Sequence, residues 1–411
     1  MAQDTDTQNT PLSADQPSSW RFETLAAAAL QQYPSIIAGQ RQLEASQSDL
    51  EAAKWERFPT PDLQASSDND VTQTVIGLQQ PLWTGGRISA GIDAASSRSQ
   101  ASSEQLTVLR QEVFEQVVDA FAEAQRASAQ LVIATRNVDE LRDLQQRIQR
   151  RVNQKASPEA DLELASSRLS EAISERTAIA QSERTSLARL SELAGQRIDD
   201  VGNAPDMAEL QLADSLDAAQ QEATEYSPRL GQLRFQQQAA RADTRSERAA
   251  FFPTLSLRLE QQETHGSGVA ASEESDSRAL IVLESSFGAG LSTAAGVSAA
   301  TSLEQSLIQE RETALRELRS TVADLWYQRE SAQLRLASAQ RTRVSAERVS
   351  ASYARQYAIG QKSWLDLMNA VREASRAGLS VEDARAEVFR TSLRLVSLTG
   401  NTGALLSNVQ P

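Results

Sequence analysis

The residue types that carry most enzyme chemistry are scarce in this sequence. It contains no cysteine and a single histidine, His265, which lies in a stretch rich in glycine, serine and glutamate that predicts an exposed loop. The sequence shows no nucleophile paired with histidine, no cluster of metal ligands and no glycine-rich phosphate loop. We therefore expect a protein without catalytic activity, resident cofactor or metal.

The ionisable residues that remain are mostly acidic. Aspartate and glutamate number 55 against 41 lysines and arginines, so the formal net charge is −14. A negative surface repels phosphate groups, and we expect no nucleic-acid partner. No run approaches the ~20 apolar residues of a membrane-spanning helix. Residues 1–20 are polar and predict a disordered tail, and residues 406–411 predict a short tail at the other end.

The elements that could position charged residues form two copies of one unit. Each copy has two prolines at the same spacing, and a phenylalanine precedes the second proline in both. Further along, residue types such as Ile76, Gly85 and Asp161 recur at one constant offset. The recurring proline pairs are Pro34 with Pro59 and Pro228 with Pro253, and the later matches are Ile281, Gly290 and Asp366. The pattern predicts two structural repeats, 21–205 and 206–405.

Each repeat predicts helix first, then a strand pair, then a helical hairpin. Alternating apolar residues predict strand pairs at 60–83 and 254–288, the second pair with a longer loop around His265. A stripe of apolar residues then predicts one helix over 88–152, about 65 residues or roughly 100 Å long. The hairpin tips are expected at 153–158, with Ser157 as the cap of the next helix, and at 358–364, where Gly360 closes a helix.

Three motifs in this order resemble the TolC-like outer-membrane efflux proteins, also called outer-membrane factors, over residues 21–405. They are the Phe-Pro pair that opens the strands of both repeats, the junction Gln-Pro-Leu-Trp-Thr-Gly-Gly-Arg at 80–87, and Tyr353-x3-Tyr-Ala-Ile-Gly-x5-Asp-Leu-Met at the second tip. The resemblance implies a mainly α protein with membrane β structure. It would be a homotrimer in which each protomer gives four strands to a twelve-stranded β-barrel that continues into a long α-helical barrel.

The resemblance also implies roles for residues near the tips. Asp366 matches an aspartate that faces the pore, so three copies would form an acidic ring that constricts it, whereas the alternative is that Asp366 caps its helix. Asn369 stands where many relatives carry a second acidic ring. A closed-state latch would use Asp161, Tyr357 and Lys362, with ordinary surface charge as the alternative.

Adaptor docking is implied for both tips. The residues concerned are Val152, Asn153 and Lys155 in the first tip and Ala358, Ile359 and Gly360 in the second. The first tip lacks the glycine, which favours three adaptor sites over six. Trp364, next to the second tip, is either a partner anchor or, as is more common, a packed residue.

The function implied is a passive exit duct in the outer membrane of a Gram-negative bacterium, extending into the periplasm. Its partners would be outer-membrane lipid, a periplasmic adaptor and an inner-membrane ABC or other transporter. The altered first tip, the missing second acidic residue and the absence of a cysteine for lipidation favour type I protein secretion. The alternatives are a duct for small-molecule tripartite efflux and a coiled-coil scaffold outside the membrane, which would have no need of the strands.

Overall fold

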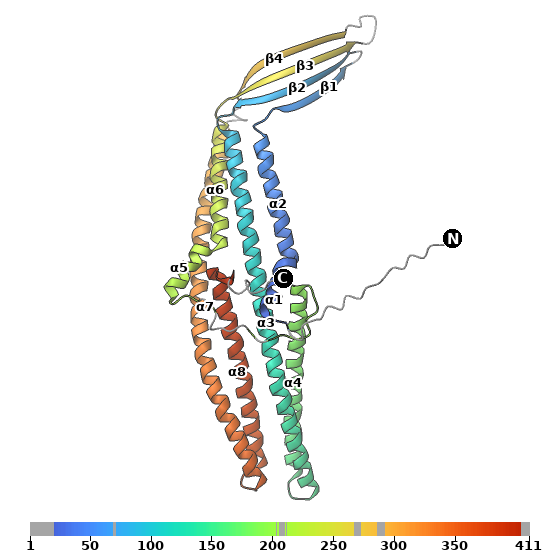
Figure 1. Cartoon of the computed structure of the whole chain (residues 1–411), viewed down its shortest axis with the longest axis vertical. Coiled ribbons are helices and arrows are strands. Elements are labelled where there is room, and N and C mark those ends of the chain that lie inside the picture. The colour runs from blue at the N-terminus through green and yellow to red at the C-terminus, as the bar shows by residue number, and fades with distance from the viewer. Residues whose placement is uncertain are drawn as a thin grey trace, which may run out of the picture.

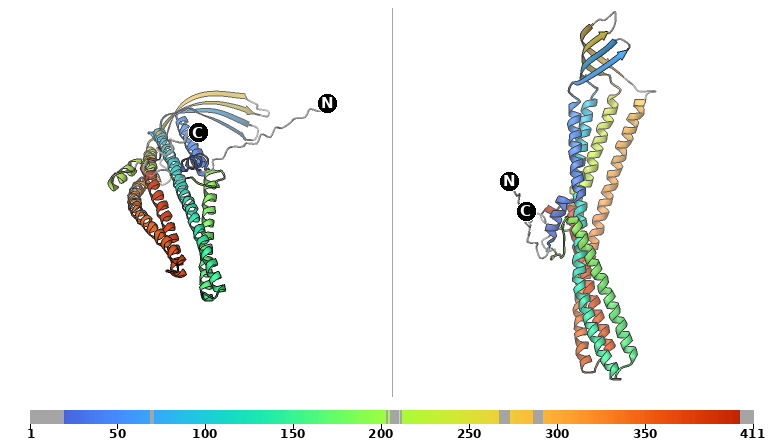
Figure 2. Two further views of the ribbon diagram at one scale, coloured as in Figure 1. Left: turned by 60° about the horizontal axis from the view of Figure 1, so that its bottom comes forward. Right: turned by 90° about the vertical axis from the view of Figure 1, so that its right-hand side faces the viewer.

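The computed structural model describes residues 20–68, 71–202, 204, 210, 212–266, 273–285 and 292–403. The molecule is elongated, with a β-sheet at one end, two helical tips at the other, and two short helices at its waist (Figures 1 and 2). The tails predicted for 1–20 and 406–411 lie outside the described residues, apart from Trp20. None of the described helices combines the length and the apolar character needed to span a bilayer.

The two halves of the chain have the same succession of helices with the same lengths. Each half contains helices of 11, 22, 67 and 36 residues in that order. The internal repeat predicted from the prolines is therefore confirmed. The pairs are α1 (Phe22–Gln32) with α5 (Leu216–Tyr226), α2 (Pro34–Trp55) with α6 (Pro228–Ala249), α3 (Arg87–Asn153) with α7 (Ser292–Ala358), and α4 (Glu159–Ala194) with α8 (Trp364–Thr399).

Local signals explain where the helices begin and end. Pro34 and Pro228 occupy the first turns of α2 and α6, where a missing N–H costs nothing. The predicted helix over 88–152 is α3, which the structure extends by one residue at each end. Pro158 has an extended backbone and is itself the cap of α4. The prediction that Ser157 caps this helix is therefore wrong by one residue.

The helices form a wall that is one helix thick. In the half nearer the sheet the packing order is α2, α3, α6, α7, and in the half nearer the tips it is α4, α3, α8, α7. Helices α3 and α7 run through both halves (Figure 1). Over its whole length α7 buries only Val322, Leu325 and Ala332, whereas α3 buries residues throughout. Among the described residues, one face of α7 therefore has no partner.

The sheet contains four antiparallel strands in the order β1 (Thr60–Asp68), β2 (Val71–Trp83), β3 (Thr254–Gly266) and β4 (Glu273–Glu284). Two strands come from each repeat, and the β2–β3 pair joins the repeats. Strand β3 reaches Gly266, so the prediction that His265 lies in a loop is wrong, although its side chain is exposed. Strand β4 lies within the predicted range 254–288, whose last residues, 286–288, fall outside the described part of the chain.

The junction between β2 and α3 uses the two glycines singled out in the sequence. Gly85 and Gly86 have φ angles of 63° and 91°, in the left-handed region that favours glycine. This conformation turns the chain from the strand into the first turn of α3. The Gly-Gly pair therefore has the structural role expected for a sharp change of direction.

Four phenylalanine rings of the helical region gather in one core at the waist, here called the waist cluster. Phe22 of α1 is fully buried, and its ring contacts those of Phe114, Phe121 and Phe389 edge-on at centroid distances of 5.8, 5.5 and 5.6 Å. In the second repeat, Trp326 packs at the equivalent place against the core between α5, α7 and α8. Trp326 is thus a packing residue.

Candidate functional site

The turn at the second tip is a Schellman motif, a helix ending closed by a left-handed residue. The amide of Gly360 donates to the carbonyl of Tyr357 at 3.0 Å, and the amide of Gln361 donates to that of Gln356 at 2.9 Å. Gly360 has a φ of 77°, which confirms the conformation predicted for it. Ala358, Ile359 and Gly360 are exposed, as a docking surface requires.

The first tip has the same turn without a glycine. The backbone amide of Lys155 donates to the carbonyl of Val152 at 2.8 Å, and the amide of Ala156 donates to the carbonyl of Arg151 at 2.8 Å. Lys155 therefore occupies the place of Gly360 with a φ of 58°, the only described non-glycine residue with positive φ. Lys155 and Asn153 are exposed and Val152 is half-buried. Because the backbones match, the missing glycine does not make the first tip a different shape.

The strained Lys155 leads to a prediction about local stability. A side chain in the left-handed region costs about 1–2 kcal/mol, and glycine avoids this strain. Because glycine loses more backbone entropy on folding, about 0.5–1 kcal/mol, only part of the gain remains as added stability. We expect Lys155→Gly to slow hydrogen exchange of the Ala156 amide roughly two- to fivefold. Lys155→Ala, which removes the charge but keeps the strain, is the control. Equal exchange in the two variants would show that the strain is absent.

Asp366 forms a capping box at the start of α8. The amide of Asp366 donates to Ser363 Oγ at 3.1 Å, while Asp366 Oδ2 accepts from the Ser363 amide at 3.3 Å and from its hydroxyl at 2.8 Å. These bonds from Ser363, together with the nearby Lys362 charge, hold the pKa of Asp366 below its ordinary value. The single chain therefore shows the capping role, and the acidic pore ring stays a prediction about the assembly.

The other residues predicted near the tips are not joined to one another in the single chain. Lys362 Nζ lies 4.5 Å from the centre of the Tyr353 ring, a cation–π contact. Asn369 is exposed, and its Oδ1 accepts from Arg372 at 3.4 Å. Asp161 lies in the first turn of α4, and in the described part of the chain no hydrogen bond or ion pair links it to Tyr357 or Lys362. The latch stays a prediction.

A hydrophobic cluster, here called the tip cluster, joins the two hairpins just above their tips. Its buried residues come from α3, α4 and α8, and Tyr357 and Trp364 pack against it. Trp364 is thus a packed residue, the more common of its two predicted roles. The buried members are Val138, Leu141, Leu144, Ile148, Ala165, Ala172, Met368 and Val371.

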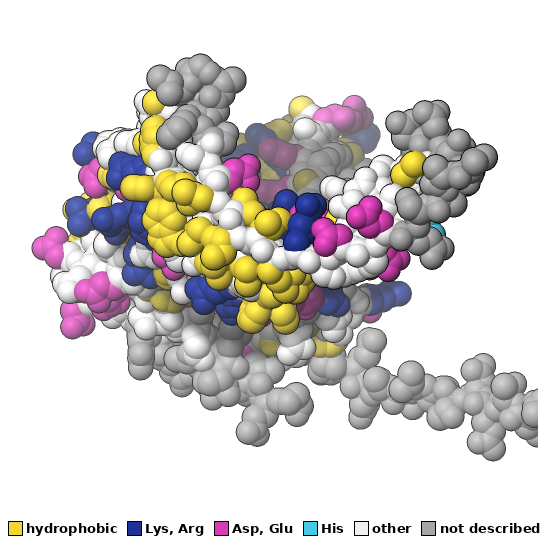
Figure 3. All heavy atoms as spheres, turned by 90° about the horizontal axis from the view of Figure 1, so that it is seen from above, with side chains coloured by type: hydrophobic (Ala, Val, Ile, Leu, Met, Phe, Trp, Pro, Cys, Tyr) yellow, Lys and Arg dark blue, Asp and Glu magenta, His cyan; other side chains and the backbone are white. Residues whose placement is uncertain are grey.

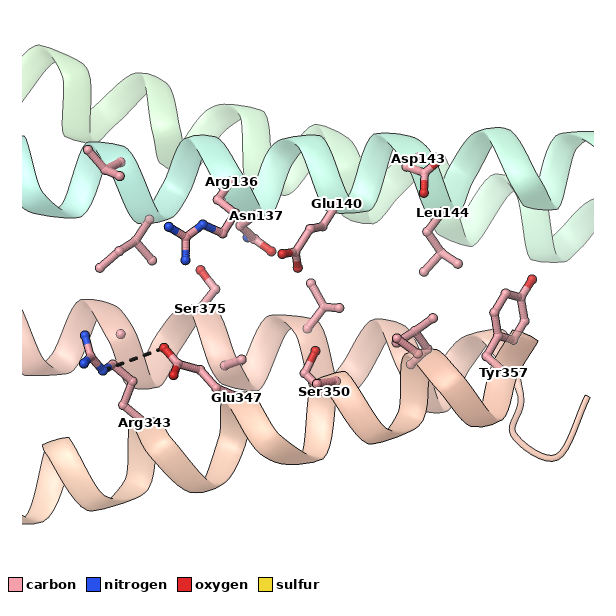
Figure 4. A pocket seen from close by; sticks show the side chains of 18 of the residues that line it. Arg136, Asn137, Glu140, Asp143, Leu144, Arg343, Glu347, Ser350, Tyr357 and Ser375 are labelled. Atoms are coloured by element: carbon pink, nitrogen blue, oxygen red, sulfur yellow. Dashed lines mark ion pairs between the residues drawn. The ribbon is translucent and has the colours of Figure 1, made fainter. Parts of the chain in front are cut away.

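Beside the tip cluster, α3 lies apart from α7 and α8 and leaves a groove of about 740 Å³, whose lining includes Leu144, Tyr357 and Val371 of that cluster. Figure 4 shows side chains from both sides projecting into it, with Tyr357 at the tip end. Asn137 and Ser375 are more than nine-tenths buried, and within the described ranges neither Asn137 Oδ1 nor Ser375 Oγ has a hydrogen-bond partner. Partial loss of solvent raises the pKa of the Glu140 carboxyl, which Arg136 partly offsets.

Polar contacts between α3 and α8 close the groove at its waist end. Gln130, which is 4% exposed, donates to Asp383 Oδ1 at 2.8 Å and to the Leu379 carbonyl at 3.1 Å. Arg126 pairs with Asp383 at 3.0 Å. The groove was not predicted from the sequence. The signal that could have revealed it is the pair Gln130 and Asn137, two amides inside the otherwise apolar stripe of α3.

This arrangement offers electrostatic and packing contacts between hairpins. Among the described residues there is no group of three or more His, Asp or Glu side chains placed to hold a metal ion. The features near the tips are a pair of matching turns, a capped aspartate and a polar groove. All of them lie at the end of the molecule opposite the sheet (Figure 1).

Comparisons with known proteins agree with this architecture. The family model described as outer membrane efflux protein matches residues 25–196 and 219–401. Comparison with curated protein sequences gives no match. A membrane protein from Pseudomonas aeruginosa has a similar structure, with a TM-score of 0.82, 18% identity and 92% of each chain covered.

Two further solved structures are similar over nearly the whole chain. CusC, whose structure is described in terms of transmembrane channel formation, has a TM-score of 0.82 and 18% identity, covering 97% of this chain and 98% of its own. The outer membrane protein VceC from Vibrio cholerae has a TM-score of 0.78 and 17% identity, covering 92% and 96%. At these identities the structures show the shared fold. With the family model matching most of its length, the chain belongs to the outer membrane efflux protein family.

Proposed function

We propose that this protein is a homotrimeric, passive exit duct of the outer membrane, loaded from the periplasm through an adaptor and an inner-membrane transporter. One observation carries the proposal: in the described part of the chain the sheet and the helical wall are each one element thick, apart from the short helices α1 and α5 at the waist, and each is open at both edges. The sheet ends in β1 and β4, and the helical wall ends in α7 on one side and in α2 and α4 on the other.

Open edges of this kind are unfavourable in a single chain. Edge strands expose unpaired N–H and C=O groups, and a lipid environment offers these groups no partner. Helix α7 also exposes Leu303, Tyr327 and Leu334, each more than half accessible. Closure of the wall by further copies removes both defects, and three copies of four strands give the twelve-stranded barrel implied by the family.

The sheet also separates this proposal from a coiled-coil scaffold, which needs no strands. Among ducts, we favour small-molecule efflux, because the family model that matches the chain is named for efflux. Type I protein secretion is the second candidate. One of its grounds was the missing glycine in the first tip, and that ground is weakened because Lys155 adopts the conformation of Gly360.

The proposed duct can be tested at its predicted constriction. A ring of three Asp366 carboxylates attracts cations, so we expect the purified trimer to conduct cations in preference to anions in planar bilayers. Asp366→Asn keeps the size of the side chain and removes the charge. It should reduce the cation preference roughly tenfold, the effect of about 1.4 kcal/mol at the constriction.

The capping role of Asp366 requires a separate control. Ser363→Ala breaks the capping box but leaves the carboxylate in place, so we expect it to keep the cation preference. A loss of selectivity in Ser363→Ala as large as in Asp366→Asn would assign the effect to the helix cap. Absence of a trimer, or of any conductance, in the unmodified protein would contradict the proposed function itself.

A further inference from the structure

The strand register divides the sheet into two faces. Residues directly opposite each other in an antiparallel pair point to the same side, so Leu63, Ile76, Gln261 and Ser277 share one face. Asp62, Gly77, Glu260 and Arg278 form the next row on the other face. On that second face Arg278 pairs with Glu260 at 2.7 Å, as befits a wet surface. The first face is here called the outer face.

The outer face is apolar only in the half of the sheet that adjoins the helices, here called the proximal half. The side chains of this half are largely exposed in the single chain: Ile281 is 74% exposed and Leu63 is 70% exposed. Figure 3 shows the hydrophobic area giving way to polar and acidic side chains toward the loops. The apolar positions in rows across the sheet are Pro61, Leu63 and Ala65 in β1, Ile76, Leu78 and Trp83 in β2, Leu255, Leu257 and Leu259 in β3, and Ala279, Ile281 and Leu283 in β4. The polar residue within these rows is Gln80, opposite Leu257, and its amide donates to the Arg57 and Pro81 carbonyls.

Exposed aromatic residues border this apolar area on the helix side, and we call them the aromatic girdle. Trp83 and Phe252 stack edge to face at 6.1 Å, and Trp55 and Phe58 lie 5.0 Å apart. Aromatic rings of this kind are enriched at the boundary between lipid and water. The members are Trp55, Phe58, Trp83, Phe251 and Phe252, all of which are exposed. No other aromatic residue occurs in the described strands.

The distal half of the sheet, nearer the loops, is polar on the outer face too. Along β3 the outer positions after Leu259 are Gln261, Glu263 and His265, and along β4 the outer positions before Ala279 are Ser277, Ser275 and Glu273. A carboxylate facing hydrocarbon is unfavourable unless it lies near the interface. The hydrocarbon layer therefore cannot extend over Glu263 without a cost in free energy.

The strand lengths give the height of the apolar part of the sheet. The 13 residues of β3 span about 43 Å, or roughly 33 Å of height at a tilt of about 40°. The six residues of β3 up to Leu259 account for about 15 Å of this height, and the remaining seven account for about 18 Å. Barrels of the outer membrane usually carry an apolar band of about 25 Å. The band of this chain is short, and it ends within the strands.

The edge of the apolar band runs obliquely across the strands. It reaches Ala65 on β1 and Ile76 on β2, but only Leu259 and Ala279 on β3 and β4, which lie further back in the register. Strands tilted in a barrel should show this slant, because a level plane crosses successive strands at different rows. The edge therefore has the geometry of a membrane surface.

We propose that membrane hydrocarbon covers only the proximal half of the sheet, up to the line through Ala65, Ile76, Leu259 and Ala279. The distal half stands in the polar headgroup layer of the outer leaflet and beyond it. The inference rests on the proposed function, because it needs the sheet to be part of a barrel in the membrane. It assigns a depth in the lipid to each row of the outer face.

The absence of cysteine from the chain gives a direct test. Single variants carrying a nitroxide label, Leu257→Cys, Ile281→Cys, Glu263→Cys and Ser275→Cys, are reconstituted in phospholipid vesicles. Accessibility to oxygen, which concentrates in lipid, is compared with accessibility to a water-soluble nickel complex. We expect the first two labels to prefer oxygen and the last two to prefer nickel, with the reversal between 259 and 263.

The other outcomes separate this inference from the proposed function. Oxygen preference at 263 and 275 equal to that at 257 would overturn the boundary and leave the membrane duct intact. Nickel preference at 257 and 281 would place the whole sheet outside the bilayer and overturn both. Gln262→Cys, on the inner face, is the matched control and should prefer nickel, because its label faces the water-filled lumen.

Discussion

Replacement of Phe22 by alanine is expected to lower the free energy of unfolding by about 3–5 kcal/mol. The side chain is fully buried at the centre of the waist cluster, where it contacts the rings of Phe114, Phe121 and Phe389. These rings belong to α3 and α8, so Phe22 joins the short helix α1 to both hairpins. Alanine leaves a cavity that the long, rigid helices cannot close by moving toward each other.

The effect can be measured by denaturant unfolding of the purified protein, followed by helical circular dichroism and tryptophan fluorescence. Trp20 packs against the waist cluster and reports on it locally. Phe235→Ala is the control, because Phe235 is only half-buried on α6 and stacks with the Arg234 side chain at 4.6 Å. A loss in Phe22→Ala no larger than in this control would contradict a central role for α1 at the waist.

The helices could be predicted closely because their ends are marked by residues with strong backbone preferences. Proline opens α2 and α6, the Gly-Gly pair precedes α3, and Gly360 follows α7. Between such marks an apolar stripe continues, interrupted in α3 by the buried amides Gln130 and Asn137. The turn at the first tip could not be predicted in the same way, because Lys155 adopts a left-handed conformation that its residue type disfavours. Residue preferences alone do not show that the hydrogen bonds of the turn hold Lys155 in this conformation.

The strands could be predicted only where one face is apolar. The alternation of apolar and polar residues identifies β2 and the starts of β1 and β3, but it is absent from the first part of β4. There the residues from Glu273 to Arg278 are polar on both faces of the sheet. The prediction of a loop around His265 is wrong for the same reason, since the residues at the end of β3 are polar on both faces.

The candidate site was predictable in its position but not in its contacts. The tips follow from helix endings, whereas the Asp366 capping box and the groove depend on how side chains meet in space. The groove in particular arises between α3 and helices from the second repeat. Its unpartnered amide and hydroxyl, Asn137 and Ser375, are far apart in the sequence and become neighbours only in the fold.

Arginine at position 281 is expected to prevent stable insertion of the sheet. Ile281 is 74% exposed and occupies the middle row of the apolar band, opposite Leu257. An arginine facing lipid near the bilayer midplane costs about 2–4 kcal/mol, so Ile281→Arg would cost roughly 6–12 kcal/mol in a trimer. We expect little heat-resistant trimer in membrane extracts and little protein in the outer-membrane fraction.

The neighbouring residue provides a matched control that depends only on the direction of the side chain. Val282 follows Ile281 in β4 and faces the opposite side of the sheet, across from Ser256. In a barrel with a wet lumen, Val282→Arg places the same charge in water at the same depth, so trimer and membrane levels should stay close to normal. Equal loss in both variants would mean that lipid does not distinguish the two faces. Loss of the trimer in Val282→Arg alone would mean that the outer and inner faces are reversed. The two substitutions are identical and lie at adjacent positions, so they differ only in the face of the sheet to which the arginine points.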